Sequence, residues 1–292
     1  MALASMSEIF ERMARNGQEF WEVVLADDMD ERQVSREASM AKMLTTWQAM
    51  QDAADSYTGR KRSVSGLVGG DGMKMRQYTF RGCAMTGGYV SEVIAEALSM
   101  AESNACMRRI VAAPTAGACG VLPAVLLPLC KYEELTQHQL LEALYVAAGI
   151  GSIIAYKASI AGASGGCQAE IGTASAMAAG ALVALRGGEG EQIGHAVAMA
   201  LKNLMGLVCD PVAGLVEVPC VKRNVIGAVN AVSAANMAVA GITSRIPVDE
   251  VIDAMGEIGD ALPADLRETG LGGLAGTPTG RKIAREVTQA GL

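Results

Sequence analysis

The sequence predicts a protein built mainly of α-helices, and three observations support this fold class. Apolar residues make up 51% of the 292 residues, yet aromatic residues make up only 4% and there are 34 glycines. Small residues must therefore fill most of the interior, which favours closely packed helices over a sheet. Alternating strand patterns are scarce: the clearest, LVEV at 215–218, is equally explained by an extended segment ahead of Pro219.

Two parts of the chain differ in character. Residues 1–60 are the most charged part and are expected to form a helical N-terminal extension with exposed faces, for example a helix over 31–50. Residues 61–292 alternate glycine-rich loops with apolar helices and are expected to form the main helical domain. No internal repeat, low-complexity tract or linker divides this domain further.

Local signals place several helices in the second part. Thr136 and Gln139 form a capping-box pattern just before the apolar run LLEALYVAAGIG. Three more helices are indicated by glycines that end a helix or by a proline that suits a first turn. These helices are expected over 173–185, 192–204 and about 247–255.

Charge and hydropathy exclude two classes of partner. The net charge of −7 argues against nucleic acid, because a phosphate binder needs a basic surface. Two uncharged stretches, 110–130 and 225–244, are long enough to span a membrane. The first contains three prolines and cannot be one helix, and the second carries polar residues that suit contacts between helices, so we expect no membrane span.

The N-terminus MALASMSEIFERMARNGQEFW bears charges where a signal peptide needs an apolar core. We therefore expect a cytoplasmic protein. Its seven cysteines should then be reduced thiols, available for a metal or for catalysis and not for a disulfide framework.

Three cysteines lie in unusual local settings. Cys167 lies in the glycine-rich stretch GASGGCQAE, whose glycines let backbone amides approach an anion or a cluster sulfide. Cys209 and Cys220 begin and end CDPVAGLVEVPC, where Pro211 and Pro219 stiffen the backbone.

The other four cysteines look different. Cys83, Cys106 and Cys130 lie in or beside apolar runs, where a thiol behaves as a small hydrophobic group. Cys119, in PTAGACG, is surrounded by glycine and is less clear.

The spacing of Cys167, Cys209 and Cys220 leaves their ligand open. A tetrahedral zinc site needs a fourth ligand, which His195 could supply, although His195 also fits a half-buried histidine on a helix. An iron–sulfur cluster held by three thiolates would leave one iron free to act as a Lewis acid on a substrate oxygen. No compact CxxC signature favours the cluster, so zinc, cluster and plain burial all remain.

Five longer motifs carry a resemblance. They are SGLVGGDG (65–72), APTAGACGVLPAVL (113–126), GASGGCQAEIGTASAMAAG (162–180), HAVAMALKNLMGLVCDPVAGLVEVPCVKRN (195–224) and GLGGLAGTPTGR (270–281). In residues and order, and over most of the chain, the sequence resembles the iron–sulfur L-serine dehydratases, specifically the α subunit of the two-subunit form.

The resemblance implies a catalytic domain over 61–292 with a [4Fe-4S] cluster bound by Cys167, Cys209 and Cys220. It also implies deamination of L-serine to pyruvate and ammonia, with the open iron acting as Lewis acid on the substrate hydroxyl. A β subunit of the same enzyme is the implied partner. The stretch TGRKIAREVTQAGL has no cysteine with which to cap the open iron, as single-chain relatives can.

Candidate substrate and catalytic groups follow from the same motifs. Asp71 and Glu170 could engage the substrate ammonium, and His195, Cys119 or a group on the partner could remove the Cα proton. All of the substrate candidates could equally be turn or cap residues. The expected donors to the substrate carboxylate are Ser65, Gly69, Gly70, Thr115, Gly117 and Ser164.

Other functions remain compatible with the sequence. A pyridoxal-phosphate enzyme would need a Schiff-base lysine, but Lys157 and Lys202 lie in helical contexts without a phosphate-binding loop. A hydratase or cysteine-desulfurating lyase could use the same three thiolates on another substrate. A zinc-stabilised, non-catalytic helical subunit is the alternative from a different class.

Overall fold

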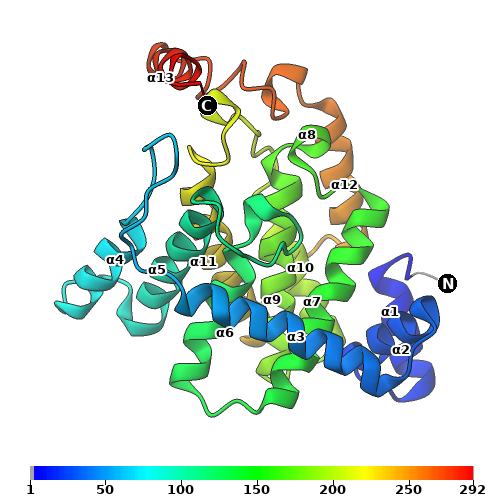
Figure 1. The fold of residues 1–292 in the computed structure, drawn as a ribbon. Helices are drawn as coiled ribbons and strands as arrows, with labels where there is room; N and C mark the ends of the chain where they lie inside the picture. Colours follow the sequence, from blue (N-terminus) through cyan, green and yellow to red (C-terminus); the bar gives the residue numbers. More distant parts are fainter. Residues whose placement is uncertain (1–2, 292) are drawn as a thin grey trace.

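Helices form all the regular secondary structure of residues 3–291, the part that the computed structural model describes, apart from one isolated bridge between Cys209 and Arg267. The predicted all-α fold is confirmed (Figure 1). The α-helices are α1 (Met6–Asn16), α2 (Phe20–Arg32), α3 (Arg36–Asp55), α4 (Asp71–Phe80), α5 (Gly87–Ala105), α6 (Val121–Tyr132), α7 (Gln137–Lys157), α8 (Gly162–Gly165), α9 (Thr173–Leu185), α10 (Gly190–Lys202), α11 (Cys220–Val239), α12 (Val248–Ala261) and α13 (Pro278–Gln289). Four short turns complete the set: the 3-10 turns η1 (Ala116–Ala118), η3 (Val212–Gly214) and η4 (Ala264–Leu266), and the π-helical η2 (Gln168–Gly172).

Helix α9 is the centre of the bundle (Figure 1). Every residue from Thr173 to Val183 is buried, and the helix packs on α6, α7, α10 and α11. A helix that is apolar on all sides has to be enclosed by neighbours in this way. Its small residues allow close approach: a Cβ added at Gly180 would clash with Ile150 Cδ1 on α7.

Helices α2 and α3 pack on α7, and α1 packs on α2, α10 and α12. Met6, Phe20 and Trp47 belong to the same buried cluster as the residues of α7 and α9. Val24 of α2 packs directly on Gly149 of α7, where any side chain would displace it. Contacts thus cross the proposed boundary at residue 60, and the division into extension and catalytic domain stays a prediction.

The predicted helix over 31–50 is wrong, because two helices meet there. Helix α2 ends at Arg32, and Gln33 adopts a left-handed backbone conformation with φ of 52°. Helix α3 begins after Ser35, whose hydroxyl accepts a hydrogen bond from the Ala38 amide at 3.2 Å. An N-cap serine is a start signal that outweighs the continuous polar pattern.

The helices predicted in residues 61–292 agree more closely with the structure. The capping box of α7 is confirmed, since Gln139 N donates to Thr136 Oγ1 at 3.2 Å and Thr136 N donates to Gln139 Oε1 at 2.9 Å. Helix α9 has the predicted bounds, α10 begins and ends two residues earlier than predicted, and α12 runs on to Ala261. The stretch 215–218 forms a turn and not a strand.

Within residues 3–291, one helix, α7, is long and apolar enough to cross a membrane, and 67% of its apolar window is buried inside the protein, as in a core helix. The stretch 110–130 is not one continuous helix, as predicted, because α6 begins only at Val121. The stretch 225–244 belongs mostly to α11, which ends at Val239.

Short irregular segments gather at the end of the bundle drawn uppermost in Figure 1. They are α8, the connection from α10 to α11, and the connection from α12 to α13. The long helices fix where these segments begin and end, and the candidate site is built from them.

Candidate functional site

Cys167, Cys209 and Cys220 converge from three separate segments. The sulfurs lie close enough that the pKa of Cys209, raised first by burial, is raised further by Cys167 and Cys220. Burial likewise raises the pKa of Cys220 to about 12, and Cys167 adds to this rise. The three thiols therefore lie near one another at this end of the bundle, Cys167 and Cys209 buried and Cys220 partly exposed.

Cys167 is held by the residues on either side of it. Gly166 has a φ of 75°, and a side chain there would strike Leu262 Cδ1 and Leu207 O. The buried Gln168 then clamps two neighbours: its Nε2 donates to Met255 O at 3.1 Å, and its Oε1 accepts from Gly206 N at 2.8 Å. The thiol is thus fixed between α12 and the loop after α10.

Cys209 is held by its backbone and by the ion pair that follows it. Its amide donates to Leu266 O at 2.8 Å, and its carbonyl accepts from Glu268 N at 2.7 Å. Arg223 donates to Asp210 Oδ1 at 2.8 Å. The other oxygen of Asp210 accepts from Leu274 N at 2.7 Å, so that one buried carboxylate ties α11 to the connection after α12.

Cys220 is the first residue of α11, at the positive end of the helix dipole, which favours a thiolate. Asn224, one turn later, joins this helix end to the turn η1. Its side chain donates to Gly117 O at 2.8 Å and to Cys220 O at 3.1 Å, and it accepts from Gly120 N at 2.8 Å. Asn224 therefore fixes Cys220 relative to the 115–120 segment.

A carboxylate, Glu170, lies close to these thiols. A Cβ at Gly162 would lie 2.8 Å from Cys209 Sγ and 3.1 Å from Glu170 Oε2, and a Cβ at Gly117 would lie 3.3 Å from the same oxygen. Burial raises the pKa of Glu170, nearby Thr115 partly offsets the rise, and Glu268 adds to it. Thr115 Oγ1 is buried but outside hydrogen-bond geometry with any described residue.

Arg223 is the cation next to the thiols. Burial raises the pKa of Cys167 to about 11, and the Arg223 guanidinium beside the sulfur counteracts part of this rise. A guanidinium in this position stabilises a thiolate or another anionic group bound there.

Thiolates are the usual protein ligands of iron–sulfur clusters, so three cysteines from separate segments fit such a group by their chemistry. Among the described residues, no three His, Cys, Asp or Glu side chains lie close enough to share one metal ion. A cluster is larger than a single ion and needs its thiolates further apart, with the metal displacing the thiol protons. Cys167, Cys209 and Cys220 would hold such a group, and the absence of side chains at Gly117 and Gly162 lets Glu170 approach Cys209.

Several predicted substrate residues serve other contacts. Ser65 donates to Glu217 Oε2 at 2.5 Å. The amides of Gly70 and Asp71 donate to the buried Glu102 at 3.0 and 2.8 Å. The side chain of Asp71 pairs with Lys74 and Lys222 at 2.8 and 3.2 Å. At Gly69, with φ of 136°, a side chain would lie 2.6 Å from Lys61 O, so packing alone requires glycine.

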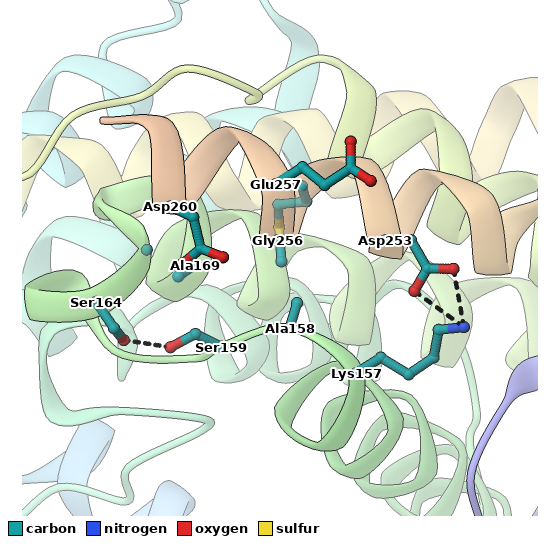
Figure 2. A pocket seen from close by; sticks show the side chains of 11 residues that line it. Lys157, Ala158, Ser159, Ser164, Ala169, Asp253, Gly256, Glu257 and Asp260 are labelled. Atoms are coloured by element: carbon teal, nitrogen blue, oxygen red, sulfur yellow. Dashed lines mark hydrogen bonds and ion pairs between the residues drawn. The ribbon is translucent and has the colours of Figure 1, made fainter. Parts of the chain in front are cut away.

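Ser164 lies in α8, three residues before Cys167. Its hydroxyl is 2.5 Å from that of Ser159, at the wall of a cavity of about 510 Å³ between α7, α8 and α12. Figure 2 shows these two hydroxyls turned toward each other, with Lys157 paired to Asp253 further along the same cavity.

The two candidates for the base lie in different places. Cys119 is fully buried, its Sγ is 3.8 Å from Met100 O, and burial raises its pKa to about 12. His195 is on α10, where its Nδ1 accepts from Ser244 N at 3.3 Å and its Nε2 is 4.0 Å from Glu191. Neither has a described contact with Glu170 or the three thiols.

Sequence reasoning missed the residues that hold the site together: Gln168, Asp210, Arg223, Asn224 and Glu268. Four of them lie within four positions of a candidate ligand cysteine. Their closeness in sequence to a candidate ligand cysteine could therefore have identified Gln168, Asp210, Arg223 and Asn224. Glu268 had no such signal, because its contact with Cys209 joins residues far apart in the chain.

Comparison with known proteins gives a consistent result. Residues 15–275 match the family model described as serine dehydratase alpha chain. The chain is 47% identical over 266 residues to the "Probable L-serine dehydratase, alpha chain" of Bacillus subtilis (strain 168), covering 91% of this chain and 89% of that one. It is 39% identical over 290 residues to the "L-serine dehydratase, alpha chain" of Peptoniphilus asaccharolyticus, covering 99% of both.

A longer relative is matched only in part. "L-serine dehydratase 2" of Escherichia coli (strain K12) is 47% identical over 181 residues, which are 61% of this chain but 40% of that protein. The residues matched by the family model include positions 167, 209 and 220, and the matches to the two alpha chains cover 89% and 99% of those proteins. The chain belongs to the serine dehydratase alpha chain family.

Proposed function

We propose that this protein deaminates L-serine to pyruvate and ammonia with a [4Fe-4S] cluster bound by Cys167, Cys209 and Cys220. The observation that carries the proposal is the convergence of three thiols from three segments beside the buried carboxylate of Glu170. The names of the relatives supply the substrate.

The reaction removes a proton from Cα and hydroxide from Cβ of serine, giving an enamine that hydrolyses to pyruvate and ammonia. Hydroxide is a poor leaving group, and the Cα proton is only weakly acidic. When bound, the cluster would supply a Lewis-acidic iron that stabilises the departing hydroxyl oxygen. The protein has to orient the substrate so that both bonds break in one geometry.

In this proposal Glu170 binds the substrate ammonium. Its carboxylate lies against Gly117 and Gly162, and Cys209 Sγ also lies against Gly162. Glu268 is a second carboxylate close enough to raise the pKa of both Glu170 and Cys209. It is exposed, with a left-handed φ of 62°, and we propose it as the group that takes the Cα proton.

The enzyme would work with a companion chain, in the cytoplasm. Two of the relatives are named as alpha chains, and the matched part of the Escherichia coli protein is less than half of that protein. We propose that a separate β-type subunit supplies the remainder. Reduced thiols, as the cluster requires, persist in the cytoplasm.

The test is pyruvate formation from L-serine by anaerobically reconstituted protein, with and without the companion chain. Activity that needs both iron and sulfide and falls at least ~10³-fold in Cys220→Ala would support the proposal. Glu170→Gln should raise KM more than it lowers kcat, because it removes a binding charge. Full activity without iron would overturn the assignment.

A further inference from the structure

Large apolar side chains stand exposed around the end of α4. Phe80, the last residue of α4, and Met85, in the connection to α5, are 93% and 96% exposed, and Tyr78, two residues before Phe80, is 43% exposed. Single exposed apolar residues are ordinary, but a group of them on one projecting element marks an interaction site. A hollow of about 370 Å³ lined by Arg76, Gln77, Phe80 and Arg81 adjoins them.

The same region is basic in an acidic protein. Residues 60–91 contain six lysines and arginines but a single acidic residue, Asp71, whereas the whole chain has a net charge of −7. Lys74 pairs with Asp71 and Arg76 with Glu96. Within residues 3–291 the remaining four basic side chains form no ion pair, and all four are exposed: Arg60, Lys61, Arg62 and Arg81.

Helix α4 is covered on one side only. It packs on α5, and together with the loop before it projects from the left side of the bundle in Figure 1. We call this region the α4 surface, defined by an apolar centre (Tyr78, Phe80 and Met85) and a basic rim (Arg60, Lys61, Arg62, Lys74 and Arg81). An apolar centre with a charged rim is the usual anatomy of a protein–protein interface.

The α4 surface adjoins the thiol site through direct contacts. Ser63 and Ser65, in the loop before α4, both donate to Glu217 Oε2, at 2.8 and 2.5 Å. Glu217 lies three residues before Cys220. A partner that seats on this loop therefore also restrains the segment that presents the third thiol.

We propose that the α4 surface is where the β-type companion chain docks, and that this chain presents an apolar centre with an acidic rim. The inference rests on the proposed function for the identity of the partner. Charge complementarity selects an acidic partner, because the rim is basic while the rest of this chain is acidic. In "L-serine dehydratase 2" of Escherichia coli (strain K12), only 40% of the length matches this chain. The rest of that protein is joined to the matched part in one polypeptide.

The experiment uses the full chain and a recombinant serine dehydratase β chain from the same organism as probe. Binding is measured by sedimentation or calorimetry at low and moderate salt. Phe80→Asp with Met85→Asp, and separately Arg81→Glu, should each weaken binding at least ~tenfold. Wild-type affinity should fall as salt rises, because the rim charges are screened.

A matched control is Ile242→Asp with Ile246→Asp, two apolar residues that are 51% and 49% exposed away from α4. This variant should bind the β chain as the wild type does. Unchanged melting temperatures would exclude misfolding as the cause of any loss. Equal weakening by the control, or no weakening by the α4 variants, would overturn the proposal.

Two further outcomes separate this inference from the proposed function. A complex that forms but makes no pyruvate would refute serine deamination, while the α4 variants would still measure docking. Full activity of the isolated chain, with no β-chain binding, would refute docking and leave the function standing. If the wild type is a homodimer and the α4 variants are monomers, the α4 surface binds a second copy of this chain. The assignment to the β chain would then be wrong.

Discussion

The centre of the bundle and the end that carries the thiols are held together by different interactions. Around α9 the side chains are small and apolar, and cohesion comes from burial and close packing. At the thiol end the segments are short, and side chains bonded to backbone groups join them. The long helices thus set where the loops begin and end. Within the loops, a few polar side chains bonded to backbone groups fix the orientation of the cysteines.

If this division is right, stability and activity should respond separately to mutation. Changes at the thiol end should act mainly on cofactor binding and turnover. Changes in the centre should act on the free energy of unfolding and leave turnover per loaded molecule intact.

Arg223→Ala should give the largest effect, because it leaves the Asp210 carboxylate buried without its cation. Removing one partner of a buried pair costs roughly 3–5 kcal/mol. We expect lower stability in denaturant titrations and failure to retain iron. The double variant Asp210→Leu with Arg223→Met should recover much of the stability but not the iron. Wild-type stability in the single variant would show that the pair does not hold the thiol end.

Gly162→Ala should separate activity from stability most clearly. The new methyl group would meet Cys209 Sγ and Glu170 Oε2. Displacement of reacting groups by a fraction of an ångström can cost ~100-fold in rate, so pyruvate formation should fall by about that factor. The overlap with Cys209 Sγ, 2.8 Å against 2.2 Å at Gly180, should lower the melting temperature less than the matched change in the centre does. Normal turnover with normal cluster content would show that the close packing of Gly162 against Cys209 and Glu170 is not needed for activity.

Gly180→Ala is the matched change in the centre. Its methyl group would clash with Ile150 of α7, and overpacking of this kind costs about 1–3 kcal/mol. Thermal unfolding should shift down by several degrees. Turnover per iron-loaded molecule should equal that of the wild type, and a loss of turnover comparable to that of Gly162→Ala would break the proposed division.

Thr136→Ala should have the smallest effect. It removes the capping box of α7, which is worth about 1 kcal/mol. Chemical denaturation should detect this loss, with activity unchanged. Thr45→Ala is the control: Thr45 is exposed within α3 and bonds only to Ala41 O, so its loss should not lower stability. Equal losses in both variants would remove the cap as the explanation.

The fold could be predicted from the sequence where the signal is local. Periodicity and caps gave the bounds of α9 and the start of α7, because both depend on neighbouring residues. The prediction failed at 31–50, where Ser35 starts a new helix inside an unbroken polar pattern. LVEV at 215–218 looked extended, but a strand needs a partner, and the bundle provides none among the described residues.

The site could be predicted in part for the same reason. Glycine and proline around Cys167, Cys209 and Cys220 set these cysteines apart from Cys83, Cys106 and Cys130, whereas Cys119 also has glycine neighbours. Which residues complete the site depends on contacts across the chain, such as Asn224 to Gly117 and Glu268 to Cys209. Such pairs are 107 and 59 positions apart, and no local pattern reveals them.

The central claim, that three thiols hold one cluster with an open iron, is tested most directly by anaerobic reconstitution with iron and sulfide. Iron, sulfide and the visible spectrum would be measured before and after L-serine is added. We expect about four irons per chain and a broad visible band that L-serine perturbs. The band should vanish in Cys167→Ala, Cys209→Ala and Cys220→Ala and persist in Cys83→Ala, whose thiol is exposed. A well-folded protein without a sulfide-dependent band, or a band that survives all three substitutions, would contradict the claim.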